Sequence, residues 1–252
     1  MRQDIHVLAY SDTGGGKSTF AATFPKPMLV LFFDPLGKDQ PYLADASEVG
    51  ELVDTPFGMM RDVKHAGGIT RLEYYHDHDP YNPSAYSFFL QRMGLFDQEK
   101  DYWRTVVLDS ITFMELTARK YHQYALNPTA KDGRQWYAGS KELLEEMLMM
   151  RFAGLKLNVV TLAHVDESKD ELHGEIVRNP AAPGKLSKRL GAAYGEHYRL
   201  YTVRGDMGEI KYVMQTTNDG LYAAQTQIKA PNPCYPHYDS IWENYEKGGT
   251  PG

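Results

Sequence analysis

Residues 11–18 read Ser-Asp-Thr-Gly-Gly-Gly-Lys-Ser and carry the clearest chemical pattern of the chain. They follow an apolar, strand-like run at residues 5–10. Small residues at such a bend let backbone N–H groups turn inward around phosphate oxygens. Lys17 would then reach the β- and γ-phosphates of a nucleoside triphosphate, and the Ser18 hydroxyl would ligate Mg²⁺. The pattern predicts a phosphate-binding loop whose binding residues are Thr13, Gly14, Gly15, Gly16, Lys17, Ser18 and Thr19.

The first position of this pattern differs from its full form, which begins with glycine. Here that position is Ser11. A glycine-rich turn without a ligand is the alternative interpretation. The order of strand, loop and helix around residues 11–18 favours the phosphate-binding loop over that alternative.

An acidic residue closes a second apolar run. Residues 105–109 read Thr-Val-Val-Leu-Asp, which places Asp109 at the carboxyl end of an expected strand. Ligands of open α/β sheets bind at that end of the strands. Together with the phosphate-binding loop, this position predicts that Asp109 holds the water shell of the Mg²⁺. The alternative is that Asp109 only caps the helix that follows.

A third apolar run, residues 158–163, ends at His164. A polar residue there would sense the γ-phosphate and pass its presence to the segment that follows. The alternative is an ordinary surface histidine, and the sequence favours neither interpretation of His164 over the other.

Alternating strand and helix signals predict a parallel α/β sheet flanked by helices. We expect strands at residues 5–10, 28–33, 71–75, 105–109 and 158–163, and helices at 17–24, 84–93, 110–125, 137–152 and 186–194. Ser110 or Thr112 would cap the third of these helices. Further on, we expect a hairpin of residues 197–204 and 210–216 and a strand at 221–225.

Two long stretches lack clear periodicity. Residues 35–68 contain several Gly and Pro, and residues 165–185 are polar and contain Pro180, Pro183 and Gly184, so both stretches are predicted to be loops. From residue 230 the chain is rich in proline and aromatic residues. This tail, residues 230–252, is too apolar for a free linker, and we expect it to dock on its own core (residues 1–229) or on a neighbouring protomer.

Composition narrows the class of protein. The chain has 252 residues and a net charge of −6, which argues against a uniformly basic nucleic-acid surface but leaves room for a local basic groove. Cys234 is the only cysteine, so no intramolecular disulfide can form, which suits a reducing cytoplasm. No signal peptide pattern opens the sequence, and no apolar run approaches the roughly 20 residues of a membrane span. We therefore expect a cytoplasmic protein without a membrane partner.

Four segments together resemble a known family. They are Gly-Gly-Gly-Lys-Ser-Thr-Phe-Ala (residues 14–21), Tyr-Trp-Arg-Thr-Val-Val-Leu-Asp-Ser-Ile-Thr (102–112), Leu-Asn-Val-Val-Thr-Leu-Ala-His (157–164) and Pro-Gly-Lys-Leu-Ser-Lys-Arg-Leu (183–190). They look like the phage-borne, RecA-like AAA-type ATPases, small relatives of the RecA and RadA recombinases that are associated with phage single-strand annealing. The resemblance covers about residues 3–230.

The resemblance implies a RecA-like P-loop core that binds ATP with Mg²⁺ between the protomers of a filament or ring. It implies single-stranded DNA as a partner, alongside a phage annealing protein or a single-strand binding protein, in the host cytoplasm if the protein is phage-encoded. On it, His164 falls at a switch position and the 165–185 segment falls where recombinases contact DNA. The cationic candidates for DNA contact are Arg178, Lys185, Lys188 and Arg189; the alternative is a solvated helix face.

Two positions depart from the family pattern. The family commonly has Asp-x-Glu-Gly after the second strand, whereas this chain has Leu36 in the place of the glutamate that orients water. Asp34 or Asp39 would have to substitute. The Lys-x-Arg that the family donates across the protomer interface is replaced by Gln225-Thr226-Gln227, with Lys229 nearby. Such a trans cation is worth roughly 10³–10⁵ in rate. The loss of both parts, the glutamate and the trans cation, predicts slow hydrolysis with nucleotide binding largely retained.

Two functional hypotheses follow. The first is an ATPase that acts on single-stranded DNA, with Lys17, Asp34 and His164 as catalytic residues and Ser18 and Asp109 at the metal. The second is a nucleotide-gated assembly module with little or no hydrolysis. A ring motor would need a translocation or nuclease domain for which the chain has no room. A kinase would be expected to carry an Arg-rich lid, which the sequence does not show.

Overall fold

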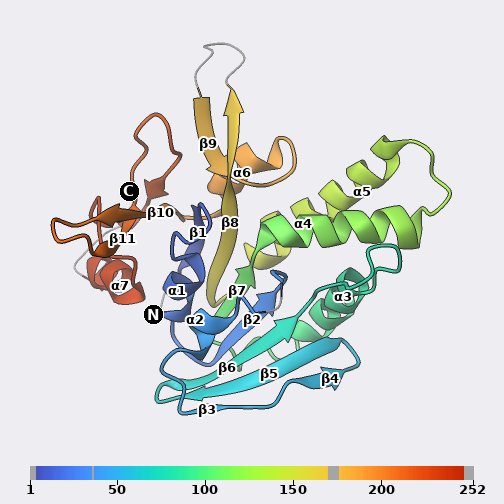
Figure 1. Cartoon of the computed structure of the whole chain (residues 1–252), viewed down its shortest axis with the longest axis horizontal. Helices are drawn as coiled ribbons and strands as arrows, with labels where there is room; N and C mark the ends of the chain where they lie inside the picture. The colour runs from blue at the N-terminus through green and yellow to red at the C-terminus, as the bar shows by residue number, and fades with distance from the viewer. Residues whose placement is uncertain (1–3, 36, 170–175, 247–252) are drawn as a thin grey trace.

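A central sheet lies between two layers of helices in the computed structural model of the chain (Figure 1). The structure describes residues 4–35, 37–169 and 176–246. The strands run in the order β11-β10-β1-β8-β7-β2-β6-β5-β3, with β4, β9 and β12 paired to β5, β8 and β10. Strands β10, β1, β8, β7, β2 and β6 are parallel to their neighbours in this order.

The strands are β1 (His6–Ser11), β2 (Met28–Phe32), β3 (Glu48–Val49), β4 (Val53–Thr55), β5 (Gly58–His65), β6 (Gly68–Tyr74), β7 (Thr105–Asp109), β8 (Asn158–Lys169), β9 (Ile176–Pro180), β10 (Glu196–Arg204), β11 (Ile210–Gln215) and β12 (Gln225–Thr226). The helices are α1 (Lys17–Ala22), α2 (Gln40–Leu43), α3 (Ala85–Phe96), α4 (Ile111–Lys120), α5 (Gly133–Glu146), α6 (Leu186–Ala193) and α7 (Tyr238–Glu246). Two π-helical segments, η1 (Tyr121–Leu126) and η2 (Met147–Phe152), continue α4 and α5.

The central strands are apolar on both faces because helices cover both. Strands β2 and β7 are buried along their whole length. Alternate residues of these strands enter two separate hydrophobic clusters. Helices α3, α4, α5 and α6 cover one face, and α1, α2 and α7 cover the other (Figure 1). The fold is therefore the mostly parallel, helix-flanked α/β sheet that the sequence predicts, with an antiparallel β10–β11 hairpin near the carboxyl terminus.

The carboxyl ends of three neighbouring strands carry the residues singled out by their chemistry. Strand β8 lies between β1 and β7. The phosphate-binding loop follows β1, Asp109 ends β7, and His164 lies on β8 directly opposite Ser11 of β1. Because the strands are parallel, these groups share one edge of the sheet.

The prediction of a loop at 165–185 is wrong for residues 165–169 and 176–180, which are strands. Strand β8 continues past the sheet to Lys169 and pairs with β9, so that Val165 lies opposite Pro180 in an antiparallel ribbon. The ribbon projects from the body of the molecule (Figure 1). Most of its residues are exposed or half-buried, and a strand without one fully buried face carries no hydrophobic alternation to reveal it. Residues 170–175 lie outside the described residues.

The prediction of a loop-rich stretch at 35–68 is also wrong in part. It contains α2, the short strands β3 and β4, and the eight-residue strand β5, which pairs with β6. Strand β5 is half-buried on both faces, so its apolar and polar residues do not alternate strictly. The strand predicted at 221–225 is reduced to an isolated bridge between Tyr222 and Arg178, followed by β12.

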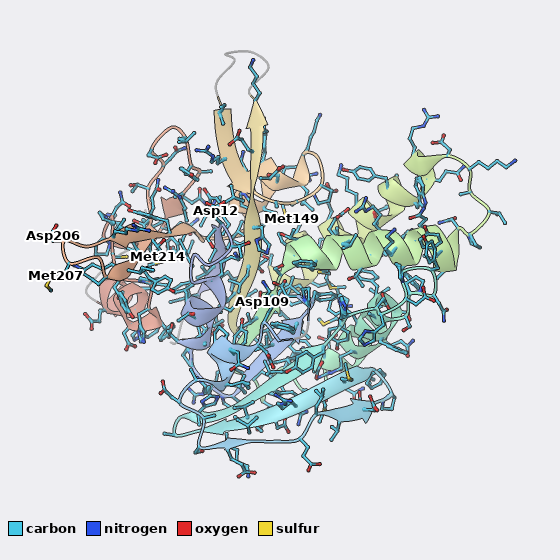
Figure 2. The ribbon with its side chains drawn as sticks, viewed as in Figure 1. Asp12, Asp109, Met149, Asp206, Met207 and Met214 are labelled. Carbon is cyan, nitrogen blue, oxygen red and sulfur yellow. The ribbon has the colours of Figure 1, made fainter. Side chains whose placement is uncertain are left out.

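The tail contains a helix, α7, that the sequence does not signal. Tyr238 and Ile241 of α7 are buried against the cluster on the α1 face, and the Tyr238 backbone N–H donates to Thr23 Oγ1 at 3.0 Å. The tail thus docks on its own core, although the domain boundary at residue 230 remains a prediction. Asp206 and Met207 lie at the tip of the β10–β11 hairpin, away from the body of the molecule (Figure 2).

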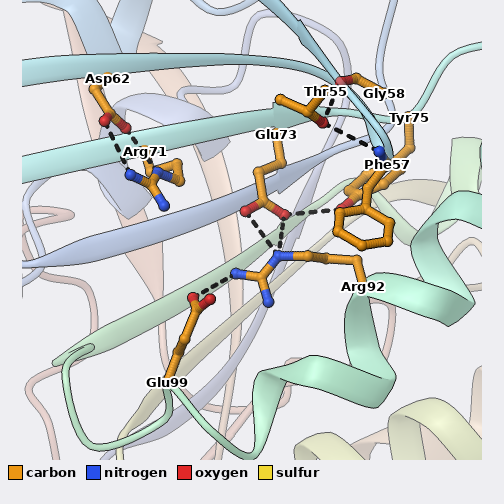
Figure 3. A network of polar contacts seen from close by, with 9 residues as sticks. All are labelled: Thr55, Phe57, Gly58, Asp62, Arg71, Glu73, Tyr75, Arg92 and Glu99. Carbon is orange, nitrogen blue, oxygen red and sulfur yellow. Dashed lines mark hydrogen bonds and ion pairs between the residues drawn. The ribbon is translucent and has the colours of Figure 1, made fainter.

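A buried ion-pair network ties α3 to the sheet (Figure 3). Arg92 of α3 donates from Nε to both carboxylate oxygens of Glu73 on β6, at 3.0 and 3.1 Å, and from Nη2 to Glu99 at 2.8 Å. Tyr75 also donates to Glu73, at 2.8 Å. A buried carboxylate held in this way has a structural role, because removing its cation would leave an uncompensated charge. None of the helices in the described part of the chain is both long and apolar enough to cross a membrane.

Candidate nucleotide site

The loop after β1 requires glycine for two different reasons. A Cβ on Gly15 would lie 2.5 Å from both Cβ and Oγ of Ser11, so the side chain at position 11 fills the space that a larger residue at 15 would need. Gly16 has a φ of +87°, which side chains rarely adopt, and a Cβ there would lie 2.8 Å from the Tyr212 ring. Ser11 in place of the usual glycine is therefore accommodated by Gly15.

Lys17 is buried at the start of α1, and its ammonium turns back over the loop. It donates to the backbone oxygens of Ser11 and Asp12 at 3.2 and 3.3 Å and to Ser11 Oγ at 3.1 Å. Burial lowers the pKa of Lys17, while Asp109, Asp34 and Asp12 oppose that effect. The ammonium and the Asp109 carboxylate thus face the same space, at the ends of β1 and β7, where Figure 2 labels Asp12 and Asp109.

Asp109 is held by two hydroxyl groups from distant parts of the chain. Ser18 Oγ donates to Asp109 Oδ2 at 2.8 Å, and Tyr42 OH of α2 donates to the same oxygen at 2.7 Å. Burial, followed by the nearby Asp34 carboxylate, raises the pKa of Asp109 from 3.8 to about 6. These contacts show Asp109 engaged with the loop and α2, which favours its metal role over the alternative of a helix cap.

The donor set fits a nucleotide bound with Mg²⁺. A hydroxyl and a carboxylate that lie within one hydrogen bond of each other supply oxygen ligands, which Mg²⁺ prefers. A buried ammonium and a glycine cradle that a Cβ would fill lie beside them. Ser18 and Asp109 would hold the metal or its waters, and Lys17 would contact the phosphates.

Asp34 follows β2 and lies beside Asp109. The Asp34 backbone N–H donates to Asp109 O at 3.4 Å, and its Oδ1 accepts from Ser110 Oγ at 2.6 Å. Ser110 occupies the N-cap position of α4 but makes no capping bond with its side chain, because its hydroxyl is turned to Asp34. Leu36, the position that departs from the family pattern, lies outside the described residues.

His164 lies within reach of the same charges. Its backbone N–H donates to Thr112 Oγ1 at 3.1 Å, and its ring Nε2 is buried without a hydrogen-bond partner among the described residues. Burial, followed by the charge of Lys17, lowers its pKa, so the ring is neutral at pH 7. A neutral imidazole with one unpartnered nitrogen beside Lys17 fits a sensor of bound phosphate better than an ordinary surface histidine.

The remaining predicted loop residues have exposed positions. Thr13 and Gly14 form the outer turn of the loop, and Thr19 is exposed on the first turn of α1.

Gln225 occupies the position of the expected trans cation. Its side-chain amide donates to the backbone carbonyls of Gly191 and Tyr194, at 2.7 and 3.1 Å.

The four candidate DNA contacts differ in their surroundings. Arg178 on β9 is paired with Glu167 at 2.9 Å and lies over the Tyr222 ring, and Arg189 on α6 is paired with Glu145 at 3.1 Å. Lys185 directly precedes α6, and Lys188 lies within it. Both lysines are exposed, and neither has an ion-pair partner among the described residues. Of the four candidates, Lys185 and Lys188 are therefore the two whose charge is not paired with a carboxylate among the described residues.

Sequence reasoning misses two groups at the site. Tyr42 lies in the stretch expected to be a loop, and Thr112 is expected only as a helix cap. Their roles depend on contacts with residues more than 50 positions away, to Asp109 for Tyr42 and to His164 for Thr112. One feature of the sequence could have indicated these groups: polar residues cluster directly after apolar runs, at 34–39 and 109–112.

Comparison with known proteins adds a family. Residues 3–226, from just before β1 to β12, match a family described as an AAA domain. No curated protein sequence matches the chain.

Two solved structures are similar in part. An ATPase from the type III secretion system of pathogenic bacteria is 13% identical with a TM-score of 0.45; the alignment covers 79% of this chain and 52% of that one, so this chain spans about half its length. The flagellar accessory protein FlaH from Methanocaldococcus jannaschii is 8% identical with a TM-score of 0.39, and the alignment covers 90% of this chain and 84% of FlaH.

Proposed function

Because the chain belongs to this AAA domain family, we propose that it is an ATP-binding ATPase that uses nucleotide to control its hold on single-stranded DNA. The observation that carries the nucleotide site is the 2.8 Å hydrogen bond from Ser18 to Asp109, with the Lys17 ammonium facing the same space. In this proposal the triphosphate lies on residues 13–19. Mg²⁺ would neutralise part of the phosphate charge.

The chain's own residues then have separate tasks. Lys17 binds the phosphates, Asp109 and Ser18 hold the metal or its waters, and His164 reports on the γ-phosphate. His164 is the last residue of β8 that pairs with β1, directly before the β8–β9 ribbon begins at Val165, so a contact at its ring would be passed to that ribbon (Figure 1). This is a population shift driven by differential contacts with ATP and ADP.

Two observations bear on hydrolysis. The Asp34 carboxylate acts on the pKa of Asp109, but Asp34 Oδ1 is engaged by Ser110. Gln225 lacks charge and is bound to backbone carbonyls. These observations favour a second candidate, a nucleotide-gated assembly module with little turnover. ATPase rates measured with and without single-stranded DNA separate the two: robust DNA-stimulated hydrolysis supports the first, and a rate near that of uncatalysed ATP with ATP-driven oligomers supports the second.

The DNA partner rests on the resemblance to recombinase relatives and on the two exposed lysines of α6. Lys185 and Lys188 would follow the phosphate backbone, which makes binding salt-dependent. We propose assembly as a filament or ring, in phage-type recombination or replication alongside an annealing or single-strand binding protein. The expected site of action is the cytoplasm.

A direct test of the DNA proposal uses anisotropy of a labelled oligonucleotide with ATPγS. Lys185→Glu with Lys188→Glu is expected to weaken binding by about tenfold or more and to reduce its salt dependence. Lys156→Glu is the matched control, because Lys156 is exposed just before β8, at the opposite edge of the sheet. Equal affinities for all three proteins would reject DNA contact by α6.

A further inference from the structure

The β10–β11 hairpin continues past the end of the strand that carries the phosphate-binding loop (Figure 1). Strand β10 pairs in parallel with β1 up to Arg199, which lies opposite Tyr10. From there the hairpin pairs only with itself, up to Arg204 opposite Ile210. Six consecutive antiparallel pairs fix its register, so a side chain on this part of the hairpin has a defined position beyond the end of β1.

Tyr212 points from this hairpin to the face of the sheet that α1 covers. It pairs with Thr202 and lies two residues before Met214. Alternate residues of a strand share a face of the sheet. Met214 is buried in the hydrophobic cluster on the α1 face. Tyr212 is therefore directed to the side on which α1 and the phosphate-binding loop lie.

The Tyr212 ring lies directly against Gly16, the N-cap residue of α1. A Cβ built on Gly16 would lie 2.8 Å from Cδ1, 3.1 Å from Cε1 and 3.6 Å from Cγ of Tyr212, so one side of the ring touches the loop backbone. The tyrosine is nevertheless 40% exposed. Among the described residues no other ring or cation packs on it, and its hydroxyl has no hydrogen-bond partner. An uncovered aromatic surface thus lies beside the loop.

The order of the strands gives the direction of a bound nucleotide. Strands β8 and β7 lie on one side of β1, and β10 and β11 lie on the other. Asp109 and His164, assigned above to the metal and the γ-phosphate, come from β7 and β8. A triphosphate whose γ end points to that side directs its nucleoside to the opposite side of β1. The Tyr212 ring is on that opposite side.

We propose that Tyr212 binds the nucleobase of the triphosphate by stacking on it with the uncovered part of its ring. This inference deepens the proposed function and rests on the nucleotide site described above. Every base has a π-face, so an aromatic ring can hold a base without hydrogen bonds to its edge. Tyrosine suits this task because it has only two χ angles to order, and the paired strand holds its backbone in place. Ile210, exposed on the same face of β11, extends the apolar surface.

The primary test compares a triphosphate with and without a base. Calorimetry with Mg²⁺ titrates ATPγS and inorganic tripolyphosphate into the wild type, Tyr212→Ala and Tyr212→Phe. Tyr212→Ala is expected to weaken ATPγS about tenfold and to leave tripolyphosphate within about twofold of wild type, since only the base loses its partner. Tyr212→Phe keeps the ring and is expected to bind both ligands as the wild type does.

Tyr102→Ala is the matched control. Tyr102 is also an exposed tyrosine, but it lies just before β7, at the opposite edge of the sheet from the loop. This variant is expected to bind ATPγS and tripolyphosphate as the wild type does. A tenfold loss of ATPγS in Tyr102→Ala as well would show that the effect is not specific to Tyr212 and would overturn the inference.

The results that would overturn the inference are distinct from those that would overturn the function. If the wild type binds neither ligand, both proposals fail. If Tyr212→Ala loses ATPγS and tripolyphosphate equally, Tyr212 supports the loop through Gly16 and base stacking is rejected. Wild-type ATPγS affinity in Tyr212→Ala, or a loss in Tyr212→Phe as large as that in Tyr212→Ala, also rejects stacking and leaves the nucleotide site standing.

A fluorescent base tests the contact itself. The triphosphate of 2-aminopurine riboside loses fluorescence when its base stacks on an aromatic ring. At saturating protein, the wild type and Tyr212→Phe are expected to quench this fluorescence, and Tyr212→Ala is expected to leave most of it. Equal quenching by the wild type and Tyr212→Ala would overturn the inference.

Discussion

Ser18 and Asp109 are 91 positions apart in the sequence, yet Ser18 Oγ donates to Asp109 Oδ2 at 2.8 Å. The pair joins the first turn of α1 to the end of β7, two strands away across β8. Both groups assigned to the metal are thus positioned before any ligand is considered. The second donor to the same oxygen, Tyr42, leaves Asp109 Oδ1 without a hydrogen bond from the described residues. That oxygen is the one available to a hydrated cation.

The contact between Ser11 and Gly15 predicts a suppressor pair. Gly15→Ala places a Cβ 2.5 Å from the Ser11 side chain, so the loop must shift and nucleotide affinity is expected to fall by about tenfold or more. Adding Ser11→Gly removes both atoms of that clash and is expected to restore most of the affinity. Fluorescent nucleotide titration measures both. A double variant no better than Gly15→Ala would contradict this account.

Gly16 provides the contrast. Gly16→Ala meets the Tyr212 ring, but its φ of +87° is unfavourable for alanine whatever the space. Tyr212→Ala is therefore not expected to rescue Gly16→Ala in the same titration. Full rescue would show that ring contact alone, and not backbone conformation, requires glycine there.

Asp109→Asn is expected to stabilise the metal-free and nucleotide-free protein. Burial raises the pKa of Asp109 from 3.8 to about 6, so the folded state binds this proton more tightly than the unfolded state does. The protonated Asp109 side chain therefore adds to the free energy of unfolding below pH 4, and this contribution is lost as the pH rises through 6. At pH 7 its loss lowers the free energy of unfolding of the wild type by about 3 kcal/mol. Urea unfolding at pH 7.5 should show a gain of up to about 3 kcal/mol in Asp109→Asn, together with loss of Mg²⁺-dependent nucleotide binding.

The pH profile supplies the check on that sign. The wild type should lose stability between pH 4 and 6 relative to Asp109→Asn, and the two curves should converge at low pH. A wild type that gains stability over this range relative to the variant would show that the carboxylate is stabilised by its surroundings, against the expected direction.

Tyr42 is expected to position the Asp109 carboxylate. Tyr42→Phe removes one of two donors from a buried oxygen, so the Mg²⁺ concentration for half-maximal nucleotide binding should rise several-fold. Tyr74→Phe is the matched control, because its hydroxyl is bonded to Asp39 and makes no bond to Asp109. The Mg²⁺ requirement of Tyr74→Phe should equal that of wild type. The same shift in both variants would assign the effect to general loosening of this region.

His164 is expected to couple nucleotide to DNA. With Nε2 unpartnered and the ring neutral, His164→Ala should leave ATPγS affinity within about threefold of wild type, because Lys17 and the loop supply most of the binding. The ratio of DNA affinities measured with ATPγS and with ADP should fall to one. Filter binding in the two nucleotides gives this ratio; a wild-type ratio already equal to one would reject the coupling.

The parts of the fold that the sequence predicts are those with strong hydrophobic patterns. Strand β7 has the boundaries expected of it because a fully buried run ends abruptly at Asp109. The central parallel sheet follows from several such runs alternating with helices. The β8–β9 ribbon and β5 were missed because their residues are exposed or half-buried, and pairing with a neighbour rather than burial holds them in place.

The candidate site divides in the same way. Lys17, Ser18 and Asp109 are predictable because local spacing fixes them at the ends of strands. Tyr42 and Ser110 are not, since each acts across a distance that only the folded chain closes. Ser110 shows the difference most clearly: its sequence context favours a helix cap, whereas its hydroxyl is bonded to Asp34.

The most direct test of the nucleotide site is calorimetric titration of Lys17→Ala with ATP and Mg²⁺ beside the wild type. Lys17 is buried at the loop and lies in the charge environment of Asp109, so the account predicts that the variant loses ATP affinity by at least about a hundredfold while remaining folded by circular dichroism. A folded Lys17→Ala protein that binds ATP as tightly as the wild type would contradict it.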